Sequence, residues 1–198
     1  MYRFNAMLVG TAPLLFGAVK KSVKEGNELD DEFELRTWRE RLNLNKHGEV
    51  VMSGYAIKSC ILDAASYLSE KIKGQGQKTY SGKFQAGLRA DAVEFPVLDG
   101  DGSPIKSENV ESLTKFVPAD GKSGGGKRVW RHFPIIHEWQ IPCRLIITDE
   151  IIDPERVERY LRSAGAFKGL GTWRPARKGD YGTFIVDEDS IKITQVVV

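Results

Sequence analysis

The sequence predicts an α+β domain of the ferredoxin-like, split βαβ type that spans residues 1–198 as a single unit. Segments with the two-residue period of a strand lie near both ends of the chain, and segments with helical period lie between them. Their order is strand, helix, extended pieces, helix, strand, and neither an internal repeat nor a linker interrupts it. An apolar content of 41% is sufficient for one hydrophobic core.

The first predicted element is a strand over residues 2–9, whose alternate apolar side chains are Tyr2, Phe4, Ala6 and Leu8. Residues 10–13 form the turn that ends it. The apolar run 6–19 also resembles the hydrophobic region of a signal peptide, but Pro13 interrupts it and it is shorter than the about 20 residues that cross a bilayer. We therefore expect a soluble protein without a membrane partner.

A charged stretch separates this strand from the first predicted helix. Residues 28–34 carry five carboxylates and are followed by three arginines, which predicts a charged loop or an extended arm. From Ser53 the apolar residues take helical spacing, at Ile57, Cys60, Ile61, Ala64, Ala65 and Leu68. Glycines at 74 and 76 end this helix.

The middle of the chain combines an extended piece with an insertion. Residues 83–98 predict an extended segment that ends before a turn at 99–102. The region 103–126 is an excursion from the core, and we place an insertion at 99–128.

Two short strands and a second helix follow. β-branched and aromatic residues across 129–148 predict the strands, which Pro134 and Pro142 confine to edge or broken positions. Asp153 is a helix cap followed by proline and an acidic first turn. The apolar face of this helix is Val157, Tyr160, Leu161 and Ala164, and Gly165 ends it.

The overall charge and the cysteines exclude some classes of protein. The net charge is +2, so only local charge indicates a ligand. Cys60 and Cys143 belong to no CxxC or Cys/His cluster, which predicts reduced, buried thiols and a cytoplasmic location. We expect no catalytic residue, no metal site and no cofactor.

A basic, glycine-rich loop over residues 165–182 lies between the second helix and a final strand or strand pair over 183–198. Residues 156–178 hold seven basic residues and one acid. The predicted nucleic-acid contacts in this region are Lys168, Trp173, Arg174, Arg177, Lys178 and Tyr181, with Phe167 interleaved among them. The glycines whose backbone amides could approach an anion are Gly165, Gly169, Gly171, Gly179 and Gly182. In the alternative interpretation, Arg156, Arg159 and Arg162 form a solvated helix face and the loop aromatics belong to the core.

A second basic segment carries four further predicted contacts, Lys122, Lys127, Arg128 and Arg131. As a flexible finger it could embrace a strand of nucleic acid; the alternative is a disordered loop. The segment 121–128 also approximates a phosphate-binding P-loop. Because arginine stands at 128, where serine or threonine should hold magnesium, we exclude nucleotide hydrolysis.

Two other groups of polar residues are weaker candidates. The histidines at 47, 132 and 137 lack metal-ligand spacing. The acidic run 28–34 could hold a divalent cation for phosphodiester cleavage, although a solvated loop is favoured.

Three segments together resemble the RAMP superfamily, in particular the backbone subunits that coat guide RNA in CRISPR effector complexes. Met7–Leu14 is similar to the first strand of the family and its Pro-Leu turn. Val50–Ser59 is similar to its strand-to-helix turn, with Lys58 following the glycine. Residues 165–184 are similar to the glycine-rich loop before its last strand.

The resemblance implies a modified RRM-like core with inserted finger or thumb segments. It further implies side-by-side packing along a single strand and contacts by Lys58 and the glycine-rich loop. Some members cut RNA with an acidic residue after the first strand, where Asp30 and Asp31 lie in this chain.

The leading hypothesis is a non-enzymatic protein that coats single-stranded RNA or DNA as a homo-oligomer or filament. A structural or assembly protein of a phage or defence complex, and a metal-dependent ribonuclease, are the alternatives. The sequence does not distinguish RNA from DNA or a filament from a ring.

Overall fold

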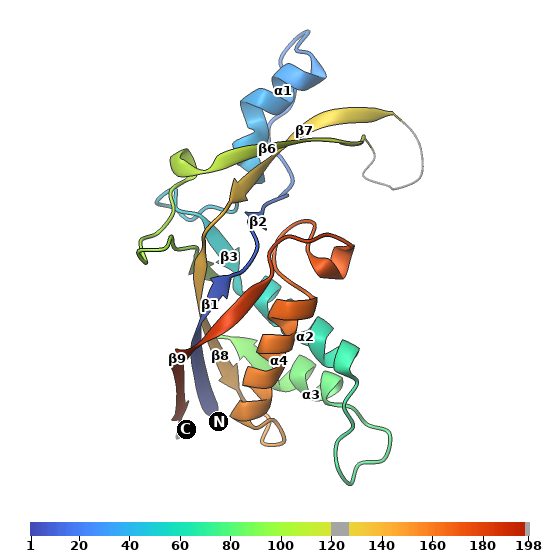
Figure 1. Cartoon of the computed structure of the whole chain (residues 1–198), viewed down its shortest axis with the longest axis vertical. Helices are drawn as coiled ribbons and strands as arrows, with labels where there is room; N and C mark the ends of the chain where they lie inside the picture. The colour runs from blue at the N-terminus through green and yellow to red at the C-terminus, as the bar shows by residue number, and fades with distance from the viewer. Residues whose placement is uncertain (120–126, 197–198) are drawn as a thin grey trace.

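The computed structural model describes residues 1–119 and 127–196 and is elongated, with the two chain ends close together at one pole (Figure 1). Its largest sheet is antiparallel and has the strand order β4-β8-β1-β9. The strands are β1 (Tyr2–Gly10), β4 (Leu88–Ala90), β8 (Gln140–Ile147) and β9 (Phe184–Gln195).

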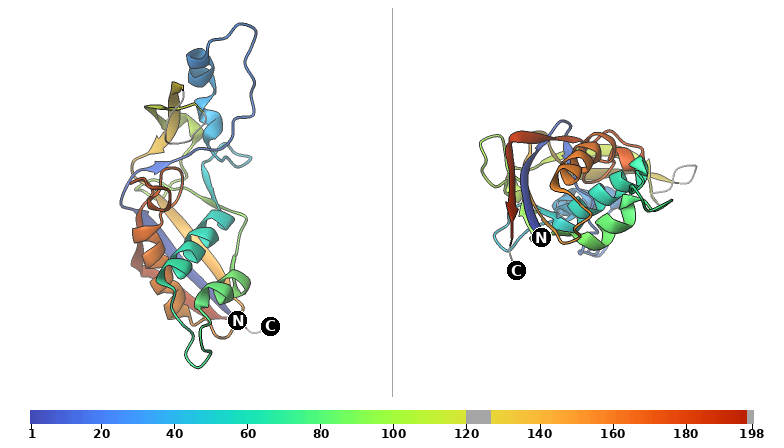
Figure 2. Two further views of the ribbon diagram at one scale, coloured as in Figure 1. Left: turned by 90° about the vertical axis from the view of Figure 1, so that its right-hand side faces the viewer. Right: turned by 90° about the horizontal axis from the view of Figure 1, so that it is seen from below.

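Three helices cover one face of this sheet, as Figure 2 shows. They are α2 (Gly54–Leu68), α3 (Tyr80–Gly87) and α4 (Pro154–Phe167). The side chain of Ser53 caps α2 by accepting from the amide of Tyr55 at 3.2 Å, and Asp153 caps α4 by accepting from the amide of Arg156 at 2.6 Å. The chain order β1-α2-β4-β8-α4-β9, together with the sheet order, is that of a ferredoxin-like fold, so the predicted fold class is confirmed.

The main core lies between the sheet and these helices. Alternate residues of β1 are buried, namely Phe4, Ala6 and Leu8, as the two-residue period predicts. Helix α2 contributes Ile57, Cys60, Ile61, Ala64 and Ala65, which all lie on one helical face. Burying each large apolar side chain stabilises the fold by about 1.5–3 kcal/mol.

A second lobe extends from the end of this core (Figure 1). It contains a sheet ordered β2-β7-β6, made of β2 (Leu14–Leu15), β7 (Arg128–Ile136) and β6 (Glu111–Pro118). Helix α1 (Asp30–Thr37) and the 3-10 turn η1 (Trp38–Arg41) pack against β7. The remaining elements are β3 (Val51–Ser53), paired with β5 (Glu94–Pro96), and the turns η2 (Ser107–Asn109) and η3 (Pro175–Arg177).

Two helices occupy segments for which the sequence predicted none. Helix α1 replaces the predicted charged loop or arm; its acids fall in the first turn and Arg36 in the last, which suits the helix dipole. Helix α3 occupies the start of the segment 83–98, which the sequence predicted to be extended. The strands of that segment, β4 and β5, begin only after the helix ends at Gly87. Helix α4 continues two residues past the predicted stop at Gly165.

The sequence predicted that Pro134 and Pro142 confine the strands at 129–148 to edge or broken positions, and the edge position is wrong. Both β7 and β8 are interior strands of their sheets. Pro142 is accommodated because β4 pairs only with residues 145–147 of β8. Similarly, β2 pairs only with Ile135 and Ile136 of β7, so no ladder bond is lost at Pro134.

Residues 103–119 of the predicted excursion at 103–126 pack against the rest of the protein, and its residues 120–126 lie outside the described residues. Ile105 and Val110 are buried in the main core, and β6 pairs with β7 along its whole length. In the described residues no helix is both long and apolar enough to cross a membrane.

Candidate nucleic-acid interface

Backbone hydrogen bonds fasten the glycine-rich loop to strand β2 and to the turn that precedes it. The amide of Gly182 donates to the carbonyl of Pro13 at 2.8 Å, and the amide of Thr172 donates to Leu15 at 2.8 Å. Within the loop, the amide of Leu170 donates to the carbonyl of Gly182 at 2.8 Å. The loop therefore presents its side chains from a fixed backbone.

The five predicted glycines are required by this packing. A Cβ added at any of them would lie between 1.8 and 2.9 Å from its nearest neighbouring atom. The amides of Gly169, Gly179 and Gly182 already donate to carbonyls of the chain. The predicted role of these three amides as free anion donors is therefore wrong, and the glycines, Gly165 and Gly171 included, allow close approach of chain segments instead.

Trp173 and Tyr181 are half-buried against the second lobe. The Trp173 ring lies 4.6 Å from the ring of Phe133 on β7 and 6.3 Å from that of Tyr181. The ammonium of Lys115 lies 5.8 and 6.0 Å from these two rings, a position that the sequence did not single out. Both aromatics thus join the loop to the hairpin β6–β7. Most of their surface is buried there, as the alternative interpretation of core residues expects.

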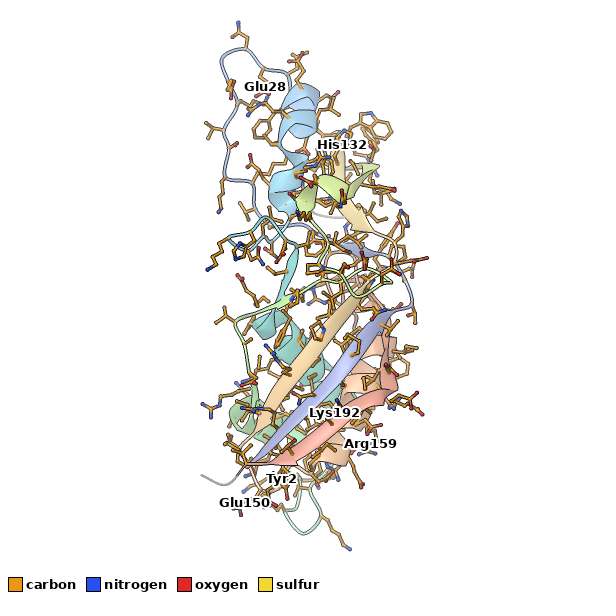
Figure 3. The ribbon with its side chains drawn as sticks, turned by 90° about the vertical axis from the view of Figure 1, so that its left-hand side faces the viewer. Tyr2, Glu28, His132, Glu150, Arg159 and Lys192 are labelled. Carbon is orange, nitrogen blue, oxygen red and sulfur yellow. The ribbon has the colours of Figure 1, made fainter. Side chains whose placement is uncertain are left out.

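The three arginines of α4 are balanced by carboxylates. Arg156 contacts the carboxylate of Glu70 at 2.9 Å, and Arg159 contacts the same oxygen. Arg162 pairs with Glu158 at 2.8 Å. Figure 3 shows Arg159 at the side of the helical layer. The local excess of positive charge therefore belongs to the loop alone.

The loop keeps four cations that make no ion pair with any described residue: Lys168, Arg174, Arg177 and Lys178. Arg177 and Lys178 are exposed in and after the turn η3. The guanidinium of Arg174 donates to the carbonyl of Gly171 at 3.0 Å, so it braces the loop. The ammonium of Lys168 lies 4.2 Å above the ring of Tyr67 on α2.

Two of these cations, Lys168 and Arg177, line an open depression of about 500 Å³, which we call the basic groove. Its other lining residues are Asp63, Ser66, Tyr67 and Ala176. Tyr67 and Phe167 are 61% and 52% exposed, with ring centroids 5.7 Å apart. Tyr67 lies 100 positions from Phe167 in the sequence, so local patterns could not associate them. The groove combines aromatic faces with unpaired positive charge, a combination that suits a nucleic-acid strand.

Lys58 and the second basic segment lie elsewhere. The ammonium of Lys58 donates to the carbonyl of Gln85 at 2.9 Å, on the opposite side of α2 from Tyr67. Lys127 and Arg128 lie at the end of the hairpin, where Lys127 is 3.9 Å from Asp30. Lys122 lies outside the described residues.

The main sheet has one open face, which is turned toward the viewer in Figure 3. The outward side chains of its two central strands are Arg3, Asn5, Met7 and Val9 of β1 and Gln140, Pro142, Arg144 and Ile146 of β8. None of them is aromatic. The open face of these two strands therefore offers no aromatic ring on which a base could stack.

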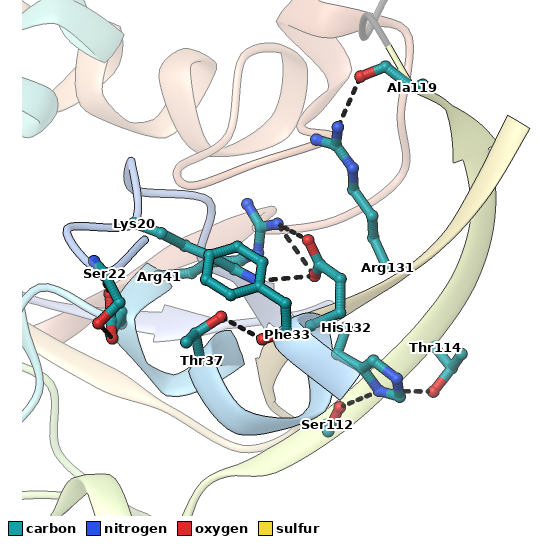
Figure 4. Close-up of polar contacts among 12 residues, drawn as sticks. Lys20, Ser22, Phe33, Thr37, Arg41, Ser112, Thr114, Ala119, Arg131 and His132 are labelled. Atoms are coloured by element: carbon teal, nitrogen blue, oxygen red, sulfur yellow. Dashed lines mark hydrogen bonds and ion pairs between the residues drawn. The ribbon is translucent and has the colours of Figure 1, made fainter. Parts of the chain in front are cut away.

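The acidic run is engaged in ion pairs that hold α1 in place. Glu34 contacts Lys20 at 2.9 Å and Arg41 at 3.1 Å, and Figure 4 shows this cluster. Burial lowers the pKa of Lys20. The hydrogen bond from Arg36 lowers the pKa of Glu28 to about 2. Among the described residues, no three acids, histidines or cysteines cluster in a way that could hold a metal ion.

The chain is a ferredoxin-like domain with an appended hairpin lobe and a basic groove. It is similar to a chain in the cryo-EM structure of the Type III-B Cmr-beta bound to cognate target RNA, with a TM-score of 0.52 and 10% identity over 97% of this chain. This chain spans 60% of the length of that one. It is also similar to Cmr6 from Pyrococcus furiosus (TM-score 0.41, 11% identity, 93% and 98% of the two chains covered) and to Thermus thermophilus Cas6 (0.36, 12%, 92% and 53%).

At 10% identity, the similarity to the Cmr-beta chain is one of fold. No family model and no curated protein sequence matches the chain.

Proposed function

We propose that this chain is a non-enzymatic protein that binds single-stranded nucleic acid, with RNA the favoured ligand, in the basic groove. The observation that carries the proposal is the set of exposed, unpaired cations beside two exposed aromatic rings. Arg177 and Lys178 supply charge for phosphates, and Tyr67 and Phe167 supply faces on which bases stack. Contacts of this kind give affinity without choice of sequence.

RNA is favoured over DNA because the Cmr-beta structure of similar fold was solved with target RNA. The same comparison supports a place in a multi-subunit complex. Side-by-side self-association along the strand is part of the proposal, since a single groove of this size covers only a few nucleotides. A purely structural assembly protein is the competing function.

The ribonuclease alternative receives little support from the acidic residues. Asp30 contacts the ammonium of Lys24 at 2.6 Å and lies near that of Lys127. Two lysines beside this carboxylate would repel a divalent cation. We therefore assign Asp30 no catalytic role.

Fluorescence anisotropy tests the proposal. Labelled single-stranded RNA, single-stranded DNA and duplex are titrated with the protein at two salt concentrations. Tight, salt-sensitive binding to single strands, strongest for RNA, is expected. Absence of binding to all three, together with a discrete oligomer in light scattering, would favour the assembly protein instead.

A further inference from the structure

The last strand of the main sheet, β9, has one edge without a partner. The strand order β4-β8-β1-β9 places it at the end of the sheet, where it pairs with β1 alone. Figure 1 shows no other helix or strand of the described chain beyond this edge. An edge strand exposes a row of backbone amides and carbonyls that can pair with another chain.

A bulge divides β9 into two halves. The register with β1 is continuous up to Asp187 and resumes at Lys192. The hydroxyl of Ser190 bridges the bulge, because it accepts from the amide of Met7 at 2.7 Å and donates to the carbonyl of Asp187 at 2.6 Å. A bulge interrupts pairing along an edge, so each half of the strand has an edge of its own.

The half before the bulge, residues 184–187, is covered by a side chain of helix α4. The Nη1 of Arg162 donates to the carbonyl of Val186 at 3.5 Å. The same guanidinium contacts the carboxylate of Glu188 at 3.2 Å. This half of the edge is therefore occupied within the chain itself.

The half after the bulge, residues 191–195, has an open edge. The amide of Val196 donates to the carbonyl of Met1 at 3.0 Å, so the backbone groups of Val196 point toward β1. Because these groups alternate in direction along an antiparallel strand, those of Ile191, Ile193 and Gln195 point away from β1. No hydrogen bond from another described residue reaches them.

The side chains of this half suit a buried strand. Ile193 is 44% exposed and lies opposite Phe4, on the face of the sheet that the helices cover. Residues 191–195 contain three β-branched side chains, no proline and no carboxylate, a composition that favours strand pairing. The one charge, on Lys192, lies on the open face of the sheet, where Figure 3 labels it.

The open edge is complementary to itself. A second copy that runs antiparallel about a two-fold axis at Ile193 places Ile193 opposite its own equivalent and Ile191 opposite Gln195. All of these residues point their backbone groups outward, so each opposite pair exchanges two hydrogen bonds. Lys192 then lies opposite Thr194, and no like charges face each other across the axis.

We infer that the edge at residues 191–195 binds the same edge of a second copy of this chain, so that the two main sheets join into one continuous sheet. A second copy fits better than an unrelated strand, because the hydrogen-bond pattern, the apolar pair and the charges all match in a single two-fold register. A two-fold contact closes on itself. It is therefore distinct from the side-by-side series along a nucleic-acid strand, and it needs no nucleic acid.

Sedimentation velocity of the full chain without nucleic acid tests the inference. The wild type should show a reversible monomer–dimer equilibrium. Ile193→Lys removes the apolar pair and places two ammonium groups opposite each other, so it should weaken dimerisation about 5- to 30-fold. Ile185→Lys is the matched control, because Ile185 is 56% exposed on the same strand but lies before the bulge. It should keep the dimerisation constant of the wild type.

A cysteine trap tests the register and does not depend on a tolerated lysine. Directly opposite, hydrogen-bonded residues have Cα atoms about 5.5 Å apart, which a disulfide can span. After mild oxidation, Ile193→Cys should therefore give a covalent dimer on non-reducing gels, whereas Ile185→Cys should not. The native Cys60 and Cys143 are buried and do not compete.

Three outcomes would overturn the inference. A wild type that stays monomeric at every concentration, with no covalent dimer of Ile193→Cys, would leave the edge without a partner. A dimer that Ile193→Lys does not weaken would place the interface elsewhere. Association into a longer series would contradict a closed two-fold pair. None of these outcomes bears on strand binding in the basic groove, which the anisotropy titration tests by itself.

Discussion

Neutralising Arg177, which lines the basic groove, and its exposed neighbour Lys178 should lower the salt dependence of strand binding by a calculable amount. The variant is Arg177→Gln with Lys178→Gln, chosen because neither side chain forms an ion pair in the described part of the chain. For single strands, the slope of log K against log salt changes by about 0.7 for each phosphate that is neutralised. Two lost contacts should make the slope about 1.4 less steep.

The slope predicts how the effect of the variant depends on salt. Between about 50 mM and about 200 mM salt, the affinity advantage of the wild type should shrink about sevenfold, which is a factor of four raised to the power 1.4. The measurement is anisotropy of labelled oligouridine at five or more salt concentrations.

A charge-matched control separates local from global effects. Lys46→Gln with Lys73→Gln removes two exposed lysines that do not line the groove. This control should keep the wild-type slope. Equal slopes for the wild type and the groove variant would refute the assignment of Arg177 and Lys178 as phosphate contacts, whatever the absolute affinities.

Three further predictions concern the fold. Burial raises the pKa of the Cys60 and Cys143 thiols to about 12, so at pH 8 both should resist a disulfide reagent in the native protein and react fully in urea. Gly182→Ala should lower the free energy of unfolding by more than about 1 kcal/mol in urea titrations, because φ is +69° there and a Cβ would lie 1.9 Å from the carbonyl oxygen of Leu170. The folded pKa of Glu28 is lowered from 4.5 to about 2 by Arg36, so its stabilisation relative to Glu28→Gln should be complete above pH 4.5 and lost by pH 2; a pH-independent difference would contradict this.

The ferredoxin-like core could be predicted because its elements carry strong periodic signals. Strand β1 alternates buried and exposed side chains, and α2 places Ile57, Ile61 and Ala65 on one face. Helices α1 and α3 could not be found in this way. Each has only eight residues, and α1 buries only Thr37 among them, so tertiary ion pairs such as Glu34 with Arg41 stabilise it rather than an apolar stripe.

The groove was predicted in part. The lining residues Lys168 and Arg177 were among the predicted contacts because they cluster in a loop that is short of acids. Tyr67 was missed because its neighbour Phe167 lies on another helix. The open edge at residues 191–195 was missed for a related reason, since the strand order that leaves it unpaired follows from the whole sheet and not from β9 alone.

Counting charges along the sequence did not show which arginines are free to bind a ligand, because carboxylates far away in the sequence pair with some of them. Arg156 and Arg159 appear in the same basic stretch as Arg177, yet Glu70 contacts both, and it lies 86 residues away from Arg156. The helix α4 packs beside α2, so its arginines meet the carboxylate that follows α2. The loop after α4 turns away from that contact through η3, and its cations stay unpaired. A basic segment therefore indicates a ligand only after the fold has shown which of its charges are already balanced.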